Sequence, residues 1–123
     1  MTSNGVYTYR CKVIRVVDGD TVDVDIDLGF SVVLKKQRIR LAGIDTPESR
    51  TRNLAEKELG LKAKERLKAL CGSEVFIQSL GVGKYGRILA IPLTREGTNI
   101  CATLINEGLA VEYWGGKKTK VWA

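Results

Sequence analysis

The sequence of 123 residues contains no histidine. This absence excludes every mechanism in which an imidazole acts as acid, base or metal ligand. Serine–histidine triads, metal-dependent nucleases with histidine ligands and ribonucleases with paired histidines are therefore excluded. Any catalysis by this chain must use carboxylates, arginines, lysines or a hard cation bound by oxygen atoms.

Cysteine is also scarce, and its pattern excludes two further kinds of site. Cys11, Cys71 and Cys101 are widely spaced and form no Cys-x-x-Cys pair. An odd number of cysteines at this spacing argues against both a disulfide framework and a zinc site. We expect all three to be small buried apolar residues of a protein in a reducing compartment.

Long apolar runs are absent as well. No stretch approaches membrane-spanning length, and the N-terminal residues lack the apolar segment of a signal peptide. No repeat, linker or low-complexity segment divides the chain. We therefore expect a single domain over residues 1–123, a cytoplasmic location and no membrane association.

Positive charge exceeds negative charge along the chain. Twenty lysines and arginines against 14 aspartates and glutamates give a formal net charge of +6. This excess favours a polyanionic partner, of which nucleic acid is the commonest.

The first third of the chain has the alternation of a three-stranded meander. We expect strands over residues 6–17, 21–28 and 31–42, joined by turns at Asp18-Gly19-Asp20 and Leu28-Gly29-Phe30. The second strand alternates apolar residues with an acidic stripe. We expect this stripe to face solvent and to pair with basic residues of the third strand; it comprises Asp23, Asp25 and Asp27, opposite Lys35, Lys36 or Arg38.

The remainder combines helices with a hairpin. Residues 55–71 have a helical pattern, residues 74–80 and 87–93 read as two strands, and Thr98 or Asn99 caps a short helix that ends at Gly108. Residues 109–113 are expected to be extended. This order predicts a mainly β fold with helices (α+β), a five-stranded OB-fold-like Greek-key barrel with one helix after the third strand. An open α+β sheet is the alternative.

The stretch from Arg38 to Ser49 concentrates the chemistry. It begins as a strand and ends in the turn Asp45-Thr46-Pro47-Glu48. Functional residues often lie where a rigid strand is followed by a loop. Two acids, an arginine and a proline at this spacing suggest a site for a metal and a phosphate. The same residues could instead start a helix, with Thr46 as N-cap and Pro47 in the first position.

Three motifs stand in order along the chain. They are Val17-Asp18-Gly19-Asp20-Thr21, then Arg40 with Ile44-Asp45-Thr46-Pro47-Glu48, then Lys84-Tyr85-Gly86-Arg87. Taken singly, the first motif is a hairpin turn and the third is a basic turn. Arg40 could simply form an ion pair with the acidic stripe on the neighbouring strand. Taken together, with a helix between the second and third motifs, they resemble the staphylococcal nuclease (thermonuclease) family over about residues 11–114.

The resemblance implies a calcium-dependent OB-fold nuclease acting on DNA, RNA or both, expected to be an endonuclease. One Ca2+ ion would be bound by the carboxylates of Asp20 and Asp45 and the backbone carbonyl of Thr46. Arg40 and Arg87 would hold the scissile phosphate, and Glu48 would act on the attacking water as a general base. The alternative is an OB-fold module that binds nucleic acid without catalysis.

The resemblance also implies further nucleic-acid contacts and two departures from the family. Lys84 and Tyr85 would contact a neighbouring phosphate, and Tyr113 and Trp114 would lie near the bound base. Gly83 stands where the family often has an acid. The family's third helix has no room after Gly116, so either Trp122 docks on the barrel or a partner covers that surface, which allows self-association.

Overall fold

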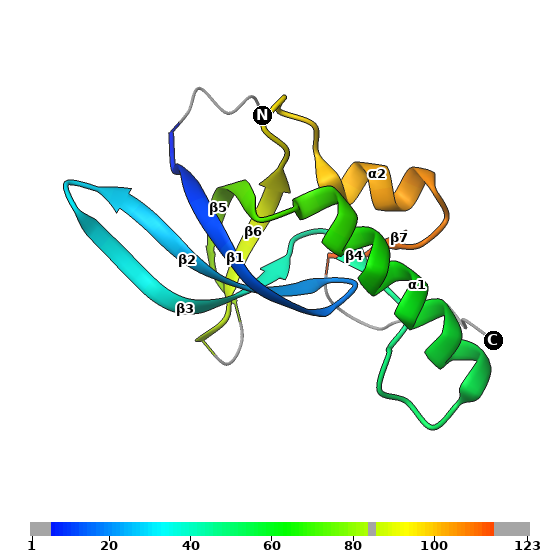
Figure 1. Ribbon diagram of the computed structural model, residues 1–123. Helices are drawn as coiled ribbons and strands as arrows, with labels where there is room; N and C mark the ends of the chain where they lie inside the picture. The colour runs from blue at the N-terminus through cyan, green and yellow to red at the C-terminus, as the bar shows by residue number, and fades with distance from the viewer. Residues whose placement is uncertain (1–5, 84–85, 115–123) are drawn as a thin grey trace.

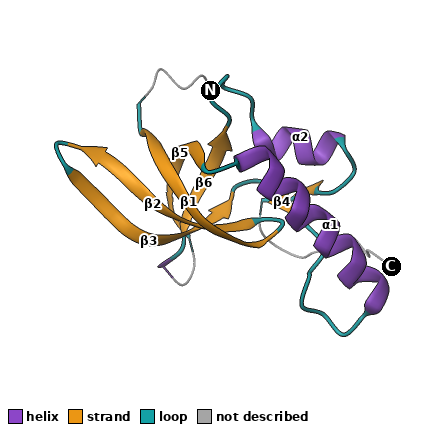
Figure 2. Ribbon diagram, viewed as in Figure 1, coloured by secondary structure: helices purple, strands orange, loops and turns teal. Residues whose placement is uncertain are grey.

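The computed structural model describes residues 6–83 and 86–114, shown in Figures 1 and 2. In chain order the elements are β1 (Thr8–Asp18), β2 (Thr21–Gly29), β3 (Val32–Leu41), β4 (Ile44–Asp45), α1 (Leu54–Cys71), β5 (Glu74–Val82), β6 (Ile88–Leu93), α2 (Ile100–Asn106) and β7 (Val111–Glu112).

Five of these strands form a closed barrel in the order β1-β2-β3-β6-β5. Neighbouring strands are antiparallel except β3 and β6, which run parallel where Ile39 to Leu41 pair with Ile88 to Ala90. The predicted five-stranded OB-fold-like barrel is therefore confirmed, and the alternative of an open sheet is wrong. Both helices lie on one side of the barrel, and the β2–β3 hairpin projects away from them (Figure 1).

The alternation of the first strands fills the barrel interior. Val22 and Val24 of β2 are fully buried, and so is Ile39 of β3. The helices close the core by contributing the buried Leu67 of α1 and Leu104 of α2. The buried residues of α1, which include Ala63, Leu67 and Cys71, recur at helical spacing, so α1 packs inward with one face.

The acidic stripe on β2 differs from expectation at its middle residue. Asp23 pairs with Arg38 as predicted, but Asp25 is only 9% exposed. A register shift between β2 and β3 at this point turns the backbone of β3 toward it, so the Lys36 N–H donates to Asp25 Oδ1 at 2.8 Å. Lys35 Nζ lies 3.3 Å from the other oxygen. The prediction that the whole stripe faces solvent is therefore wrong for Asp25.

Helix α1 begins at Leu54, later than the helix starting at Pro47 that was one interpretation of the sequence. Its N-cap is Asn53, whose side chain accepts the Glu56 N–H, and Gly72 forms the C-cap. Residues 46–48 are not helical, so the hypothesis that Thr46 caps a helix beginning at Pro47 is wrong. The cap of α2 is Asn99, one of the two predicted candidates.

A short two-stranded sheet lies outside the barrel. The sequence predicted a turn beginning at Asp45, but Ile44 and Asp45 form strand β4, which pairs with β7. Such a pairing joins segments more than 60 residues apart, and local pattern cannot reveal it. The extended stretch predicted for residues 109–113 contains β7 as its regular part.

All three cysteines are buried, as predicted. In the described part of the chain, neither helix is both long and apolar enough to cross a bilayer. The predicted contacts of Lys84 and Tyr85, and the expected lack of a third helix with docking of Trp122, concern residues outside those described.

Candidate active site

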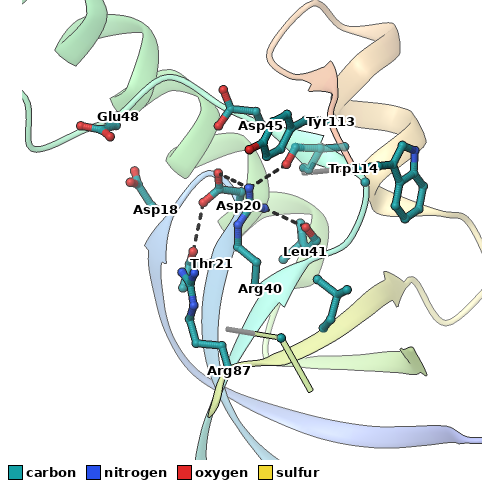
Figure 3. A pocket seen from close by; sticks show the side chains of 14 residues that line it. Asp18, Asp20, Thr21, Arg40, Leu41, Asp45, Glu48, Arg87, Tyr113 and Trp114 are labelled. Carbon is teal, nitrogen blue, oxygen red and sulfur yellow. Dashed lines mark hydrogen bonds and ion pairs between the residues drawn. The ribbon is translucent and has the colours of Figure 1, made fainter. Parts of the chain in front are cut away.

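A pocket of about 580 Å3 opens at the end of the barrel beside β4 and β7 (Figure 3). Most of the predicted site residues line it, although they come from segments far apart in the sequence. These are Asp20, Arg40, Asp45, Glu48, Arg87, Tyr113 and Trp114. The barrel and the β4–β7 sheet thus bring one group of carboxylates and one pair of arginines to the same opening.

Asp20 ends the β1–β2 turn, and several neighbours hold its carboxylate. The Thr21 hydroxyl donates to Oδ1 at 3.0 Å, and the Thr46 N–H donates to Oδ2 at 3.4 Å. Its backbone carbonyl accepts the Leu41 N–H at 2.8 Å, which ties the turn to the end of β3. The carboxylate is therefore oriented before any ligand binds.

Arg40 projects from β3 toward Asp20 (Figure 3). Its Nη1 and Nη2 groups donate to the carbonyl oxygens of Leu41 and Ile44, both at 2.8 Å. Nη2 also lies 3.5 Å from Asp20 Oδ2. Arg40 therefore pairs with the site carboxylate. The hypothesis that Arg40 only forms an ion pair with the acidic stripe on β2 is wrong.

Asp45 reaches the pocket from β4, and the pairing of β4 with β7 places two aromatic residues beside it. Asp45 is buried, with 6% of its surface exposed. The Tyr113 N–H donates to the Gly43 carbonyl at 2.9 Å. The ring of Trp114 then lies over Gly43, where an added Cβ would be 2.5 Å from Trp114 Cζ2. Trp114 itself stays 68% exposed at the rim of the pocket.

Glu48 lies on the loop that follows β4, where it is exposed between the buried residues Pro47 and Ser49. Its backbone N–H donates to Glu56 Oε2 of α1 at 3.1 Å. The next residue, Ser49, donates its N–H to Asp18 Oδ1 at 3.3 Å. These two bonds tie the loop to α1 on one side and to the β1–β2 turn on the other.

Asp18 and Thr21 belong to the pocket, but the sequence analysis did not select them. Asp18 was named in the first motif and as part of a hairpin turn, but no role in the site was predicted for it. The signal that could have identified it was the Asp-Gly-Asp sequence itself, whose two acids flank a single glycine. Thr21 was hidden because it begins a regular strand.

Thr46 is placed differently from the other predicted ligands. It does not line the pocket, and it is 4% exposed. Its hydroxyl has no hydrogen-bond partner among the described residues, and it packs toward Gly19, where an added Cβ would be 2.9 Å away. Its contribution within the described structure is the N–H that it donates to Asp20.

The side chains around the pocket that could bind a metal offer oxygen atoms as ligands. Within residues 6–83 and 86–114, no three histidine, cysteine, aspartate or glutamate side chains are grouped so as to hold a metal by themselves. Cys101 does not line the pocket, and burial raises the pKa of its thiol to about 12, so the free thiol is not a nucleophile at neutral pH.

Comparison with known proteins assigns the chain to a family. The sequence model described as "Staphylococcal nuclease homologue" matches residues 38–121. The chain belongs to this family. The resemblance stated from the motifs is confirmed, and the match includes Arg40, Asp45, Glu48 and Arg87. Asp20 precedes the matched range, but the pocket places it beside those residues.

Curated members of the family give the same result. The chain is 36% identical over 121 residues to a "Micrococcal nuclease" of Shigella flexneri, an alignment that covers 90% of this chain and 63% of that protein. It is 38% identical over 103 residues to a "Thermonuclease" of Staphylococcus hyicus, covering 80% and 56%. It is 32% identical to "Endonuclease YhcR" of Bacillus subtilis, covering 86% and 9%. The chain thus spans less than two thirds of the length of these relatives.

Proposed function

We propose that the chain is a calcium-dependent nuclease that hydrolyses phosphodiester bonds of DNA, RNA or both. One observation carries the proposal: the β1–β2 turn, residues 40–48 and the residue before β6 bring Asp20, Arg40, Asp45, Glu48 and Arg87 to one pocket. A module that only binds nucleic acid has no need for a glutamate at such a site. The nuclease names of the relatives support the same activity.

The donor set of the pocket fits a hard cation. Asp20 and Asp45 supply carboxylate oxygens, and the described part of the pocket contains neither a thiolate nor an imidazole. Calcium takes six to eight oxygen ligands, so two carboxylates and the proposed Thr46 carbonyl would leave positions for water and a substrate phosphate. The proposed ligands are therefore Asp20, Asp45 and Thr46, and bound calcium would stabilise negative charge on the phosphate.

Arg40 and Arg87 are proposed to bind the scissile phosphate. A guanidinium stays charged at every physiological pH and can donate two parallel hydrogen bonds to phosphate oxygens. Arg40 is already held by Leu41 and Ile44, so it would need little reorganisation when the charge of the transition state develops. Glu48 is proposed to take a proton from the attacking water, or to orient that water.

The remaining contacts are proposed to position the polynucleotide. Trp114 presents an exposed ring at the rim of the pocket, and Tyr113 lines the same side. An aromatic face binds any unpaired base by stacking, without sequence preference. Lys84 and Tyr85 are proposed to contact a neighbouring phosphate.

The test compares cleavage with binding. Plasmid DNA and RNA should be cleaved in calcium and left intact in chelator. Glu48→Gln should slow single-turnover cleavage by roughly a hundred- to ten-thousandfold while oligonucleotide affinity changes little. Glu96→Gln, which alters an exposed glutamate outside the pocket, is the matched control. Cleavage that survives chelator would disprove the calcium assignment, and full activity of Glu48→Gln would disprove the role of Glu48.

A further inference from the structure

Three residues share one face of helix α1 and contact the segments that carry the acids of the pocket. Glu56, Gly60 and Ala63 are spaced by four and three residues, which places them one above another on a helix. Glu56 and Gly60 meet the loop that carries Glu48, and Ala63 meets the β1–β2 turn. The same helix face therefore contacts both acidic segments.

The contact at Gly60 explains a glycine in an unfavourable place. Glycine weakens a helix interior, and Gly60 lies seven residues into α1. A Cβ there would overlap the carbonyl group of Glu48 and lie 2.6 Å from Ser49 N. Backbone atoms cannot move away as a flexible side chain can. Only glycine therefore allows the helix to approach the Glu48–Ser49 peptide this closely.

Hydrogen bonds hold the peptide groups on both sides of Glu48, one of which is the Glu48–Ser49 peptide that Gly60 approaches. Glu56 Oε2 accepts the Glu48 N–H at 3.1 Å, one helical turn before Gly60. Asp18 Oδ1 accepts the Ser49 N–H at 3.3 Å. The backbone on both sides of the Glu48 side chain is thus fixed by the helix and by the β1–β2 turn.

The third contact fixes the turn to the helix. A Cβ on Gly19 would lie 2.7 Å from Ala63 Cβ, so the turn that carries Asp18 and Asp20 also packs directly on α1. A rigid helix that touches both segments sets the distance between them.

We infer that α1 is the positioning element of the pocket, and that Glu56 and Gly60 act through the backbone of Glu48. This inference rests on the proposed nuclease function for its catalytic consequence. It adds two positioning residues that do not themselves touch substrate. A misplacement of about 1 Å can reduce a rate on the order of a hundredfold. Gly60→Ala should therefore slow cleavage by about that factor, although alanine favours the helix.

The experiment is a double-mutant cycle of Gly60→Ala with Glu48→Gln, read by single-turnover cleavage. If Gly60 acts through Glu48, Gly60→Ala should cost about a hundredfold in the parent and less than about threefold in Glu48→Gln. Oligonucleotide affinity should change by less than about threefold in both backgrounds. Equal losses in the two backgrounds would overturn the inference and leave the nuclease function intact.

A second readout does not depend on activity. Amide hydrogen exchange of the Glu48 N–H should be at least about tenfold faster in Glu56→Ala than in the parent, and close to the parent in Glu56→Gln, which keeps an acceptor oxygen. Glu58→Ala removes an exposed acid two residues away and is the matched control.

The two readouts separate the possible failures. Parent-like exchange in Glu56→Ala would overturn the positioning role even if the protein cleaves nucleic acid. Fast exchange in Glu56→Ala together with an inactive parent would refute the nuclease proposal and keep the contact between α1 and the loop. Should Gly60→Ala fail to fold, the Glu56 variants test the same contact by both cleavage and exchange.

Discussion

Arg40 Nη2 lies 3.5 Å from Asp20 Oδ2, so the proposed phosphate ligand is paired with the proposed calcium ligand. Two of the donors of the guanidinium are used by Leu41 and Ile44. Because a guanidinium has five N–H groups, others remain for a phosphate. The same guanidinium therefore contacts the proposed calcium ligand and two backbone carbonyl groups. A substitution of Arg40 should affect both the stability of the fold and the activity.

Arg40→Lys should lower both stability and activity. A lysine keeps the charge, but its single nitrogen cannot reproduce the fork that serves the carbonyl oxygens of Leu41 and Ile44. Leaving these buried acceptors without donors should reduce the free energy of unfolding by about 1–3 kcal/mol. Urea denaturation and single-turnover cleavage would measure the two effects. Arg52→Lys, on the exposed loop after Glu48, is the control. A variant with parent stability would show that the two hydrogen bonds contribute little.

Asp20→Ala and Asp45→Ala should abolish both calcium binding and cleavage while the barrel stays folded. Each variant removes one of the two carboxylates proposed for the cation, and calcium needs several oxygen ligands. Isothermal titration with calcium would report binding, and circular dichroism would confirm the fold. Glu96→Ala removes a distant exposed carboxylate as a control. Unchanged calcium affinity in either variant would exclude that residue as a ligand.

Trp114→Ala should weaken binding of single-stranded oligonucleotides. The ring rests on Gly43 and leaves much of its surface exposed at the pocket. Loss of one stacked base costs about 1–3 kcal/mol, or roughly five- to 150-fold in affinity. Equilibrium binding in the Glu48→Gln background avoids cleavage during the measurement. Trp114→Phe keeps an aromatic face and should retain most of the affinity; equal loss in both variants would argue against stacking.

Asp23→Asn should reduce stability in a pH-dependent way. Asp23 accepts two hydrogen bonds from Arg38 and lies 3.5 Å from Arg15, and these interactions, the Arg38 bond first, hold its pKa below the ordinary value of 3.8. Ionised Asp23 therefore stabilises the fold above pH 3.8, and this contribution disappears as the pH falls through its lowered pKa.

For a surface pair the effect should be about 1 kcal/mol or less at pH 7, and smaller in high salt. Urea denaturation of the parent and Asp23→Asn at pH 7 and at pH 2–3 would measure it. A difference that stayed constant across this range would show that the asparagine disturbs packing and that charge is not the cause. Glu96→Gln serves again as the control for loss of one exposed acid.

The sequence alone determined the elements whose signals are local. The alternation of Val22 and Val24 specified a half-buried strand, and Thr98 and Asn99 marked the start of a helix, which the structure caps with Asn99. The three motifs were sufficient to identify the family, because they are short, ordered and separated by a recognisable helix. The proposed chemistry came from the resemblance to that family, and the absence of histidine agrees with it because it leaves carboxylates, basic side chains or a hard cation for catalysis.

Only the tertiary structure decided what depends on distant segments meeting. The pairing of β4 with β7 and the contact of Asp18 with Ser49 each join parts of the chain that share no local pattern. The burial of Asp25 follows from a register shift between two strands, which alternation does not encode. In the sequence, Gly60 was only a residue that weakens a helix. Its role is visible in the tertiary structure alone, because the backbone of Glu48 that packs against it comes from another segment.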